Sequence, residues 1–235
     1  MELNEIMDEL KSLGSERTKK IYMGNGANEP LYGVSISAMK PLYKKLKINQ
    51  ELAEALYATG NYDAMYLAGM IAEPNKMTKE DFNRWIKQAY FYMISDFIVA
   101  VTLSESDIAF SVSDEWVNCE DELVKSAGYS CYTWLLGSRK DIEFNKEKLL
   151  RLLNIVKKTI HTEPNRAKYA MNNFLIAVGV SYTPLHEEAL QIAKEVGNVE
   201  VYNKDRLLPI HNAYEEIIKQ ANKGRIGFKR KYVRC

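Results

Sequence analysis

The sequence is poor in the residues that cross-link or interrupt a chain, with only 3 Cys, 6 Pro and 12 Gly among 235 residues. Cys119, Cys131 and Cys235 are an odd number and lie far apart, which argues against a disulfide framework and for reduced thiols in the cytoplasm. No segment approaches the roughly 18 apolar residues of a membrane span. The first helix, Met1 to about Leu13, is too acidic for a signal peptide. We therefore expect a soluble, cytoplasmic protein without a membrane partner.

An excess charge of either sign is also missing. The 32 Lys and Arg nearly balance the 31 Asp and Glu, so the formal net charge of +1 indicates no partner. Hydrophobic residues make up 46% of the chain, which excludes a disordered protein. A chain of this length can bury one large core. We expect a single domain over residues 1–235, with a basic tail from about residue 223 to 235.

Motifs for metal or cofactor binding are absent as well. None of His161, His186 and His211 lies four residues from another His or from a Cys, so a zinc site is not expected. Gly24 and Gly26 form only a fragment of a glycine-rich phosphate loop, without a preceding strand or a third Gly. The sequence therefore predicts neither a metal nor a cofactor.

Helical periodicity is present from end to end, as in the apolar face of Leu3, Ile6 and Leu10. Thr78 and Ser104 each precede an Asp by three residues, which predicts two capping boxes at helix starts. Residues 199–202 alternate as in a strand, but one such run cannot build a sheet. The fold class is therefore all-α.

Four segments carry small residues in the middle of a bulky helix. They are residues 62–72, 96–104, 122–136 and 166–179. Their central alanines recur at roughly 30–45 residues, in the range of HEAT repeats. Small residues let helix backbones approach closely, so these segments are expected to be inner helices flanked by amphipathic outer helices. The pattern predicts a HEAT-like or ARM-like superhelical stack of antiparallel helix pairs, curved, with the inner helices lining a concave face.

The tail is the first candidate functional feature. It contains six basic residues, no acidic residue, and Phe228 and Tyr232 between them. Such a tail suits binding to a phosphate backbone, and the alternative is a solvated basic terminus. The basic residues are Lys223, Arg225, Lys229, Arg230, Lys231 and Arg234.

Polar residues inside the inner helices are the second candidate feature. Asp96, Lys125 and the Asn172–Asn173 pair interrupt otherwise apolar segments. A buried polar group costs free energy unless it is hydrogen-bonded. These side chains therefore either bridge helices or face a groove.

Several stretches also resemble the AlkD-like DNA alkylation repair family. The N-terminal stretch is IYMGNGANEPLYGVSISAMKPLYKK at residues 21–45, and the tail reads GRIGFKRK at residues 224–231. Residues 122–136 and 166–179 are similar to the later repeats of that family. The resemblance implies a HEAT-repeat DNA glycosylase that excises alkylated purines such as N3-methyladenine without a metal or cofactor. In such enzymes a carboxylate supports the cationic sugar and an Arg grips phosphate.

The resemblance carries over unevenly to single residues. Tyr22 matches the family's N-terminal Tyr, and Lys125 stands where the phosphate-gripping Arg is expected, without its bidentate fork. Asp96 is the candidate catalytic carboxylate, although alignment on the neighbouring acidic residue puts the catalytic position at Val99. Asn173 stands where the resemblance would place a Trp that contacts the lesion. These departures leave enzymatic activity open.

The leading hypothesis is a monomeric protein of the alkylation repair type that binds double-stranded DNA. It would release N3- or N7-alkylated purines if Asp96 reaches the sugar. One alternative is a catalytically inactive homologue that binds DNA structures. The other is a protein–protein interaction scaffold using the same groove. Substitution of Lys125 and of the basic residues in the tail is expected to weaken duplex binding.

Overall fold

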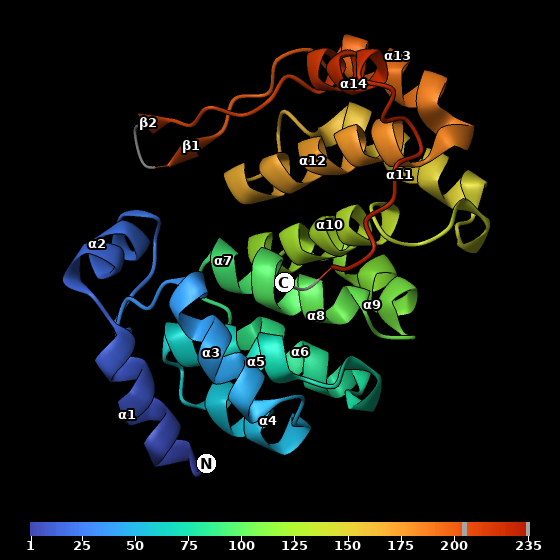
Figure 1. The fold of residues 1–235 in the computed structure, drawn as a ribbon. Helices are drawn as coiled ribbons and strands as arrows, with labels where there is room; N and C mark the ends of the chain where they lie inside the picture. Colours follow the sequence, from blue (N-terminus) through green and yellow to red (C-terminus); the bar gives the residue numbers. More distant parts are fainter. Residues whose placement is uncertain (204–205, 234–235) are drawn as a thin grey trace. The chain divides into compact units, whose positions relative to one another are not determined.

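The computed structural model describes residues 1–203 and 206–233. These residues form two compact units, 1–109 and 110–233 (Figure 1). A single domain over residues 1–235 stays a prediction. Arg234 and Cys235, which belong to the predicted tail, lie outside the described residues.

The first unit consists of short helices joined by loops. They are α1 (Leu3–Leu13), α2 (Glu16–Gly24), α3 (Ile36–Leu46), α4 (Gln50–Ala58), α5 (Tyr62–Ile71), η1 (Pro74–Lys76), α6 (Lys79–Gln88), α7 (Tyr92–Ile94), η2 (Ser95–Val99) and α8 (Ala100–Ser104).

The second unit contains longer helices and one small strand pair. They are α9 (Ala109–Trp116), which begins at the boundary, α10 (Glu122–Leu136), η3 (Asp141–Glu143), α11 (Lys146–Thr159), α12 (Asn165–Ser181), η4 (Thr183–Leu185), α13 (His186–Val196), β1 (Tyr202–Asn203), β2 (Arg206–Leu207) and α14 (Ala213–Asn222).

The predicted division into inner and outer helices is present in each unit. Helix α5 is buried along almost its whole length, whereas its neighbour α4 buries only one face. In the second unit α10 and α12 are the inner pair, and α11 and α13 pack outside with amphipathic faces. Each unit is therefore a stack of helix pairs, as the small-residue pattern predicts.

Glycines explain how closely the inner helices approach their neighbours. A Cβ atom on Gly128 of α10 would lie 2.7 Å from the backbone nitrogen of Val117. On Gly179 of α12 it would lie 2.6 Å from Cδ1 of Ile217 in α14. Real Cβ atoms do not come closer than about 3 Å to other heavy atoms, so a Cβ atom does not fit at Gly128, and at Gly179 the Ile217 side chain would have to shift. The small residues in the inner helices thus set the spacing of the helices.

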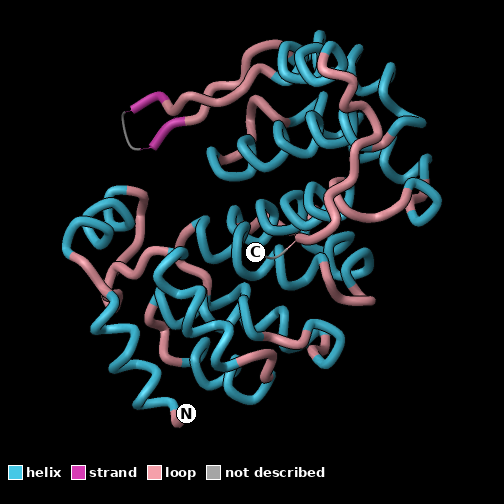
Figure 2. Tube along the Cα trace, in the orientation of Figure 1, coloured by secondary structure: helices cyan, strands magenta, loops and turns pink. Residues whose placement is uncertain are grey.

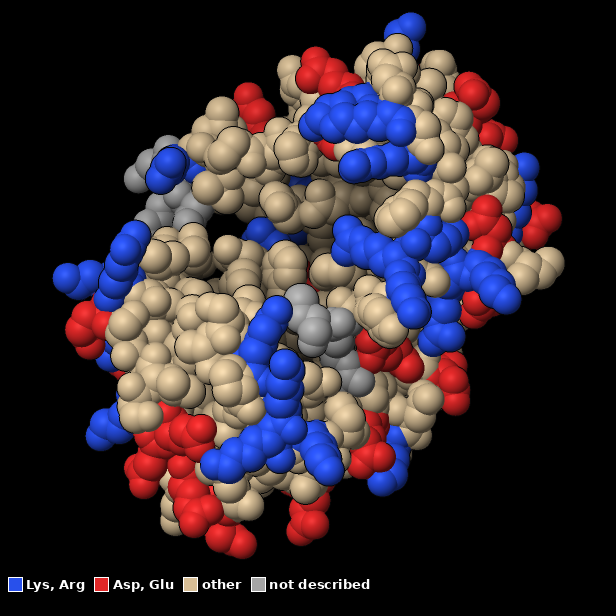
Figure 3. All heavy atoms as spheres, viewed as in Figure 1, with Lys and Arg blue, Asp and Glu red and all other residues tan. Residues whose placement is uncertain are grey.

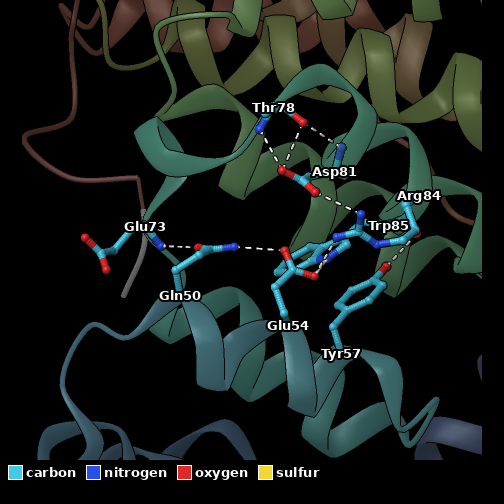
Figure 4. A network of polar contacts seen from close by, with 8 residues as sticks. All are labelled: Gln50, Glu54, Tyr57, Glu73, Thr78, Asp81, Arg84 and Trp85. Carbon is cyan, nitrogen blue, oxygen red and sulfur yellow. Dashed lines mark hydrogen bonds and ion pairs between the residues drawn. The ribbon is translucent and has the colours of Figure 1, made fainter.

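Helices α4 and α6 of the first unit are joined by a polar network centred on Glu54 (Figure 4). Its carboxylate accepts hydrogen bonds from Gln50 Nε2 at 2.9 Å, from Arg84 Nη2 at 2.7 Å and from Trp85 Nε1 at 3.0 Å. The Tyr57 ring stacks on the Trp85 indole with 4.0 Å between centroids, and its hydroxyl donates to the Trp85 carbonyl. The network joins α4 to α6 through ring stacking and charge-assisted hydrogen bonds.

Of the two predicted capping boxes, one is confirmed and one is wrong. Thr78 caps α6, because its hydroxyl accepts from the Asp81 amide and the Asp81 carboxylate accepts from the Thr78 amide. Ser104 instead is the last residue of α8, and its hydroxyl donates to the Val101 carbonyl at 2.7 Å. Bonding back into the preceding turn is an alternative open to any Ser near a helix end.

The alternating run at residues 199–202 leads into a two-stranded hairpin (Figure 2). Tyr202 pairs with Leu207 and Asn203 with Arg206, in antiparallel register. The Tyr202 amide also donates to Asn165 Oδ1 at 3.0 Å, which ties the hairpin to the start of α12. Over the described residues, every helix is too short or too polar to span a bilayer.

Candidate nucleic-acid interface

Asp96, the candidate catalytic carboxylate, lies in η2, a single π-helical turn over Ser95–Val99. Its side chain is only 3% exposed, and Oδ1 accepts a hydrogen bond from Ser95 Oγ at 2.8 Å. Val99, the alternative catalytic position, is apolar and fully buried. A carboxylate must approach a sugar to stabilise its positive charge. In this conformation Asp96 is largely shielded from solvent, and its catalytic role stays a prediction.

Tyr22 is half-buried in an aromatic cluster of the first unit. Its ring packs edge-to-face on Tyr62 with 4.9 Å between centroids, and Phe91 packs on the same Tyr62 ring. The Tyr22 hydroxyl donates to the Val34 carbonyl at 2.9 Å, and burial raises the pKa of this phenol. The hydroxyl is therefore neutral and occupied at physiological pH, so a DNA contact would be made by the exposed part of the ring.

Asp63 holds the loop on which Tyr22 depends, and the sequence reasoning missed it. The buried carboxylate accepts hydrogen bonds from the backbone amides of Tyr32 at 2.5 Å, Gly33 at 3.0 Å and Val34 at 2.8 Å. Burial raises the pKa of Asp63, and the three amides oppose that shift. The sequence shows Asp63 only as a single Asp in the first turn of a predicted helix. The loop amides that it binds are about thirty residues away in the sequence, so the pairing could not be predicted.

Lys125 of α10 is half of an ion pair in the second unit. Its Nζ lies 2.6 Å from Oε2 of Glu163, in the turn before α12, and each side chain is 16% exposed. A phosphate would have to compete with this carboxylate for the ammonium group. The DNA contact of Lys125 stays a prediction, and the pair shows that the side chain also ties α10 to the segment before α12.

The Asn172–Asn173 pair divides into a buried and a half-exposed residue. Asn172 donates from Nδ2 to the His211 carbonyl at 2.9 Å and is 1% exposed, whereas Asn173 is half-exposed. Near the start of the same helix, the Arg166 guanidinium lies 4.5 Å from the centroid of the Tyr169 ring. Asn173, Arg166 and Tyr169 are all half-exposed on α12, and the sequence analysis named only Asn173 among them.

Residues 223–233, here called the C-terminal strap, are docked on the second unit. The Gly227 amide donates to the Val180 carbonyl at 2.8 Å, and the Arg230 amide donates to the Gly137 carbonyl at 2.6 Å. The strap thus runs from the end of α12 to the end of α10. A freely solvated basic terminus, the alternative left open by the sequence, does not describe these residues.

Two basic side chains of the strap serve in its docking. Lys229 Nζ lies 2.8 Å from both Asp141 Oδ1 and the Leu136 carbonyl. The Arg230 guanidinium lies 5.4 Å from the centroid of the Trp134 ring, a cation–π distance. The ammonium group of Lys229 is therefore occupied by contacts within the protein. Arg230 remains exposed to solvent.

The remaining basic side chains of the strap are exposed. Within the described residues, Lys223, Arg225 and Lys231 have no carboxylate partner. Figure 3 shows Lys and Arg side chains gathered where the strap crosses the second unit. The structure thus brings together, in one segment, the five basic residues predicted between positions 223 and 231, with Lys229 turned inward.

A separate basic surface lies on α3 and the residue after it, in the first unit. Lys40, Lys44 and Lys47 are exposed, and Figure 3 shows the corresponding group of basic side chains over α3. Lys40 and Lys44 are four residues apart and so share one face of α3, and Lys47 is the residue that follows the helix. The sequence KPLYKKLK carried this signal, which the sequence reasoning used only as part of a family resemblance.

Two further observations concern metal-ligating and nucleophilic side chains. No three His, Cys, Asp or Glu side chains among them are grouped so that they could hold a metal ion. Cys131 is fully buried, as predicted, and burial raises the pKa of its thiol to about 12. The strap exposes cations and aromatic rings, groups that can bind phosphates and bases.

Comparison with known proteins identifies the family. The family of DNA alkylation repair enzymes matches residues 6–210. An uncharacterized protein of Listeria monocytogenes is 31% identical over 225 residues, covering 94% of this chain and 97% of the relative. One of Listeria innocua is 30% identical over 227 residues with the same coverage. The chain belongs to the DNA alkylation repair enzyme family.

A solved structure similar to this family member is also informative. It is 60% identical, with a TM-score of 0.96 over 100% of both chains. That protein represents a family described as related to the HEAT-like repeat DNA glycosylases, with affinity for branched DNA structures. The likeness confirms the HEAT-like all-α fold and the resemblance to alkylation repair proteins.

Proposed function

We propose that this member of the alkylation repair family binds DNA and prefers branched structures. The observation that carries the proposal is the full-length likeness, at 60% identity, to a protein described as having affinity for branched DNA structures. At that level of identity and coverage the basic surfaces are expected to be shared. Binding as a protein–protein scaffold is less favoured, because α3 and the strap carry several exposed cations that can neutralise phosphates.

The electrostatics of the two units support this proposal. Each unit carries its own group of exposed cations, Lys40, Lys44 and Lys47 in the first and the strap residues in the second. A branched DNA presents phosphates on several arms, whereas a short linear duplex presents one continuous track. The cations of each unit can neutralise phosphates, and each neutralised phosphate adds to affinity through counterion release.

Base excision is the second candidate function. The family match over residues 6–210 favours it. The 3% exposure of Asp96 and its bond to Ser95 oppose it, because the carboxylate would have to leave its pocket to approach a sugar. We therefore favour DNA binding over base excision as the function of this protein. Release of methylated base from an alkylated duplex, measured with wild type and Asp96→Asn, tests whether the protein excises bases.

The binding proposal is tested by titrating labelled DNA with the full chain. A four-way junction and a linear duplex of the same length should be compared at several salt concentrations. The triple variant Lys223→Ala/Arg225→Ala/Lys231→Ala should bind more weakly, with a salt slope less steep by about 0.9 for each phosphate that is no longer neutralised. Lys158→Ala, at an exposed position of α11, is the matched control and should bind like wild type. Equal binding by the triple variant and wild type would exclude the strap as the DNA-binding segment.

A further inference from the structure

Two aromatic side chains of the strap are unusually exposed. Phe228 is 61% exposed and Tyr232 is 70% exposed, although both lie in a segment docked on the protein. Aromatic rings normally bury most of their surface in a core or an interface, because leaving them in water forfeits the hydrophobic free energy. Rings that stay exposed on a docked backbone are suited to receive a ligand.

The docking contacts fix where the Phe228 ring stands. Gly227 and Arg230 are hydrogen-bonded through their backbones on either side of Phe228, and Lys229 is turned inward to Asp141. The strap therefore presents Phe228 outward between two anchors. A ring held in this way loses little conformational entropy when a base stacks on it.

Cations flank both rings. Lys231 Nζ lies 5.2 Å from the centroid of the Tyr232 ring, and the exposed Arg225 and Arg230 stand within three residues of Phe228 in the sequence. Alternation of aromatic rings with Lys or Arg is the arrangement that binds unpaired nucleotides, since bases stack on the rings while the cations follow the phosphates. A base inside a duplex cannot offer its face to such a ring, so the partner must have unpaired bases.

We propose that the strap is a binding site for single-stranded nucleotides, such as those at the branch point or free arm of a DNA substrate. Phe228 and Tyr232 stack on bases, and Arg225 and Lys231 neutralise phosphates. Lys229 is a positioning residue that holds the strap through Asp141. The inference rests on the proposed function, because it assigns to this segment the unpaired part of a branched DNA.

The test compares three labelled DNAs: a fully paired four-way junction, a fork with two single-stranded arms, and an oligothymidine. Phe228→Ala/Tyr232→Ala should weaken binding to the fork and the oligothymidine about five- to a hundredfold. Binding to the paired junction should change less than about twofold, because the cations remain. Ile142→Ala, at an exposed apolar side chain of the same unit, is the matched control and should leave all three affinities unchanged.

Folding and positioning are checked by limited trypsin digestion, since the strap contains several Lys and Arg. Phe228→Ala/Tyr232→Ala should be cut within the strap at the wild-type rate. Lys229→Met should be cut faster and should also lose affinity for oligothymidine, and Lys229→Arg should restore both. If Lys229→Met is cut faster but binds oligothymidine normally, positioning by Lys229 is excluded.

The outcomes separate this inference from the proposed function. Wild type that binds the junction but not oligothymidine, or a double aromatic variant that binds the fork normally, overturns the strap site alone. Wild type that binds none of the three DNAs overturns the proposed function as well. If a polyglutamate peptide displaces oligothymidine as well as a second oligothymidine does, the strap is a site for acidic peptides and the nucleotide proposal is wrong.

Discussion

Replacing Lys125 with Met removes one half of the ion pair that joins α10 to the turn before α12. The Nζ–Oε2 distance to Glu163 is 2.6 Å, and only 16% of each side chain is exposed. After the substitution the Glu163 carboxylate remains in a largely enclosed position without its cation. We expect the folded state to lose stability for this reason, independently of any effect on DNA binding.

The expected loss lies between two limits. Exposed ion pairs contribute about 0–1 kcal/mol, and removing one partner of a fully buried pair costs about 3–5 kcal/mol. The partial burial of Lys125 and Glu163 argues for about 2 kcal/mol, which for a chain of this size lowers the melting temperature by about 4–8 °C. Glu163→Gln should cost a similar amount, because it leaves the ammonium group uncompensated.

A double-mutant cycle measures the pair directly. Lys125→Met/Glu163→Gln leaves neither charge behind, so it should lose about 1–2 kcal/mol less than the sum of the two single variants. The measurement is chemical denaturation followed by circular dichroism. Lys157→Met, which breaks the more exposed pair with Glu195, is the control and should melt like wild type. If the Lys125 and Glu163 substitutions prove additive, the pair contributes nothing and the role of Lys125 must lie elsewhere.

Three further predictions concern single residues. Glu54→Ala should destabilise the protein by about 1–3 kcal/mol in thermal melts, because three donors lose their acceptor; unchanged melting would show that the network is dispensable. Cys131 should resist iodoacetamide at pH 8 while Cys119 reacts, since burial raises the pKa of the Cys131 thiol to about 12; peptide mass mapping shows which thiol is modified. Gly128→Ala should cost about 1–3 kcal/mol and more than Gly179→Ala, because a backbone atom cannot move aside as the Ile side chain can; denaturant midpoints give the order.

Features that depend on residues close together in the sequence could be predicted well. Helix α10 covers the predicted residues 122–136, because Asp121 caps its start and Gly137 follows its last residue. The glycines and alanines of the inner helices indicated where neighbouring helices pack closely, because a small residue in an otherwise bulky helix leaves room for a neighbouring backbone. The inner and outer layers of each unit follow from these signals.

Features that depend on distant residues could not be predicted. Lys125 and Glu163 are 38 residues apart, and Lys229 reaches the carbonyl of Leu136 across 93 residues. Each of these lysines looked available for phosphate because its partner is specified only by tertiary packing. The same limit hid the loop that Asp63 holds.

The helix face on which Asp96 lies could not be predicted from the sequence, for a different reason. A π-helical turn adds one residue to a helix and so changes the phase of the side chains around it by about 100°. The helical pattern at residues 92–104 gave no sign of such a turn, and the face on which Asp96 lies could not be worked out from spacing alone.

The comparison of a four-way junction with a linear duplex of equal length tests the central claim most directly. At physiological salt, wild-type protein should bind the junction at least about tenfold more tightly than the duplex. The logarithm of its affinity for the junction should fall linearly with the logarithm of the salt concentration. Equal affinity for the two DNAs, or an affinity for the junction that does not respond to salt, would contradict the claim that the cations of α3 and the strap bind branched DNA.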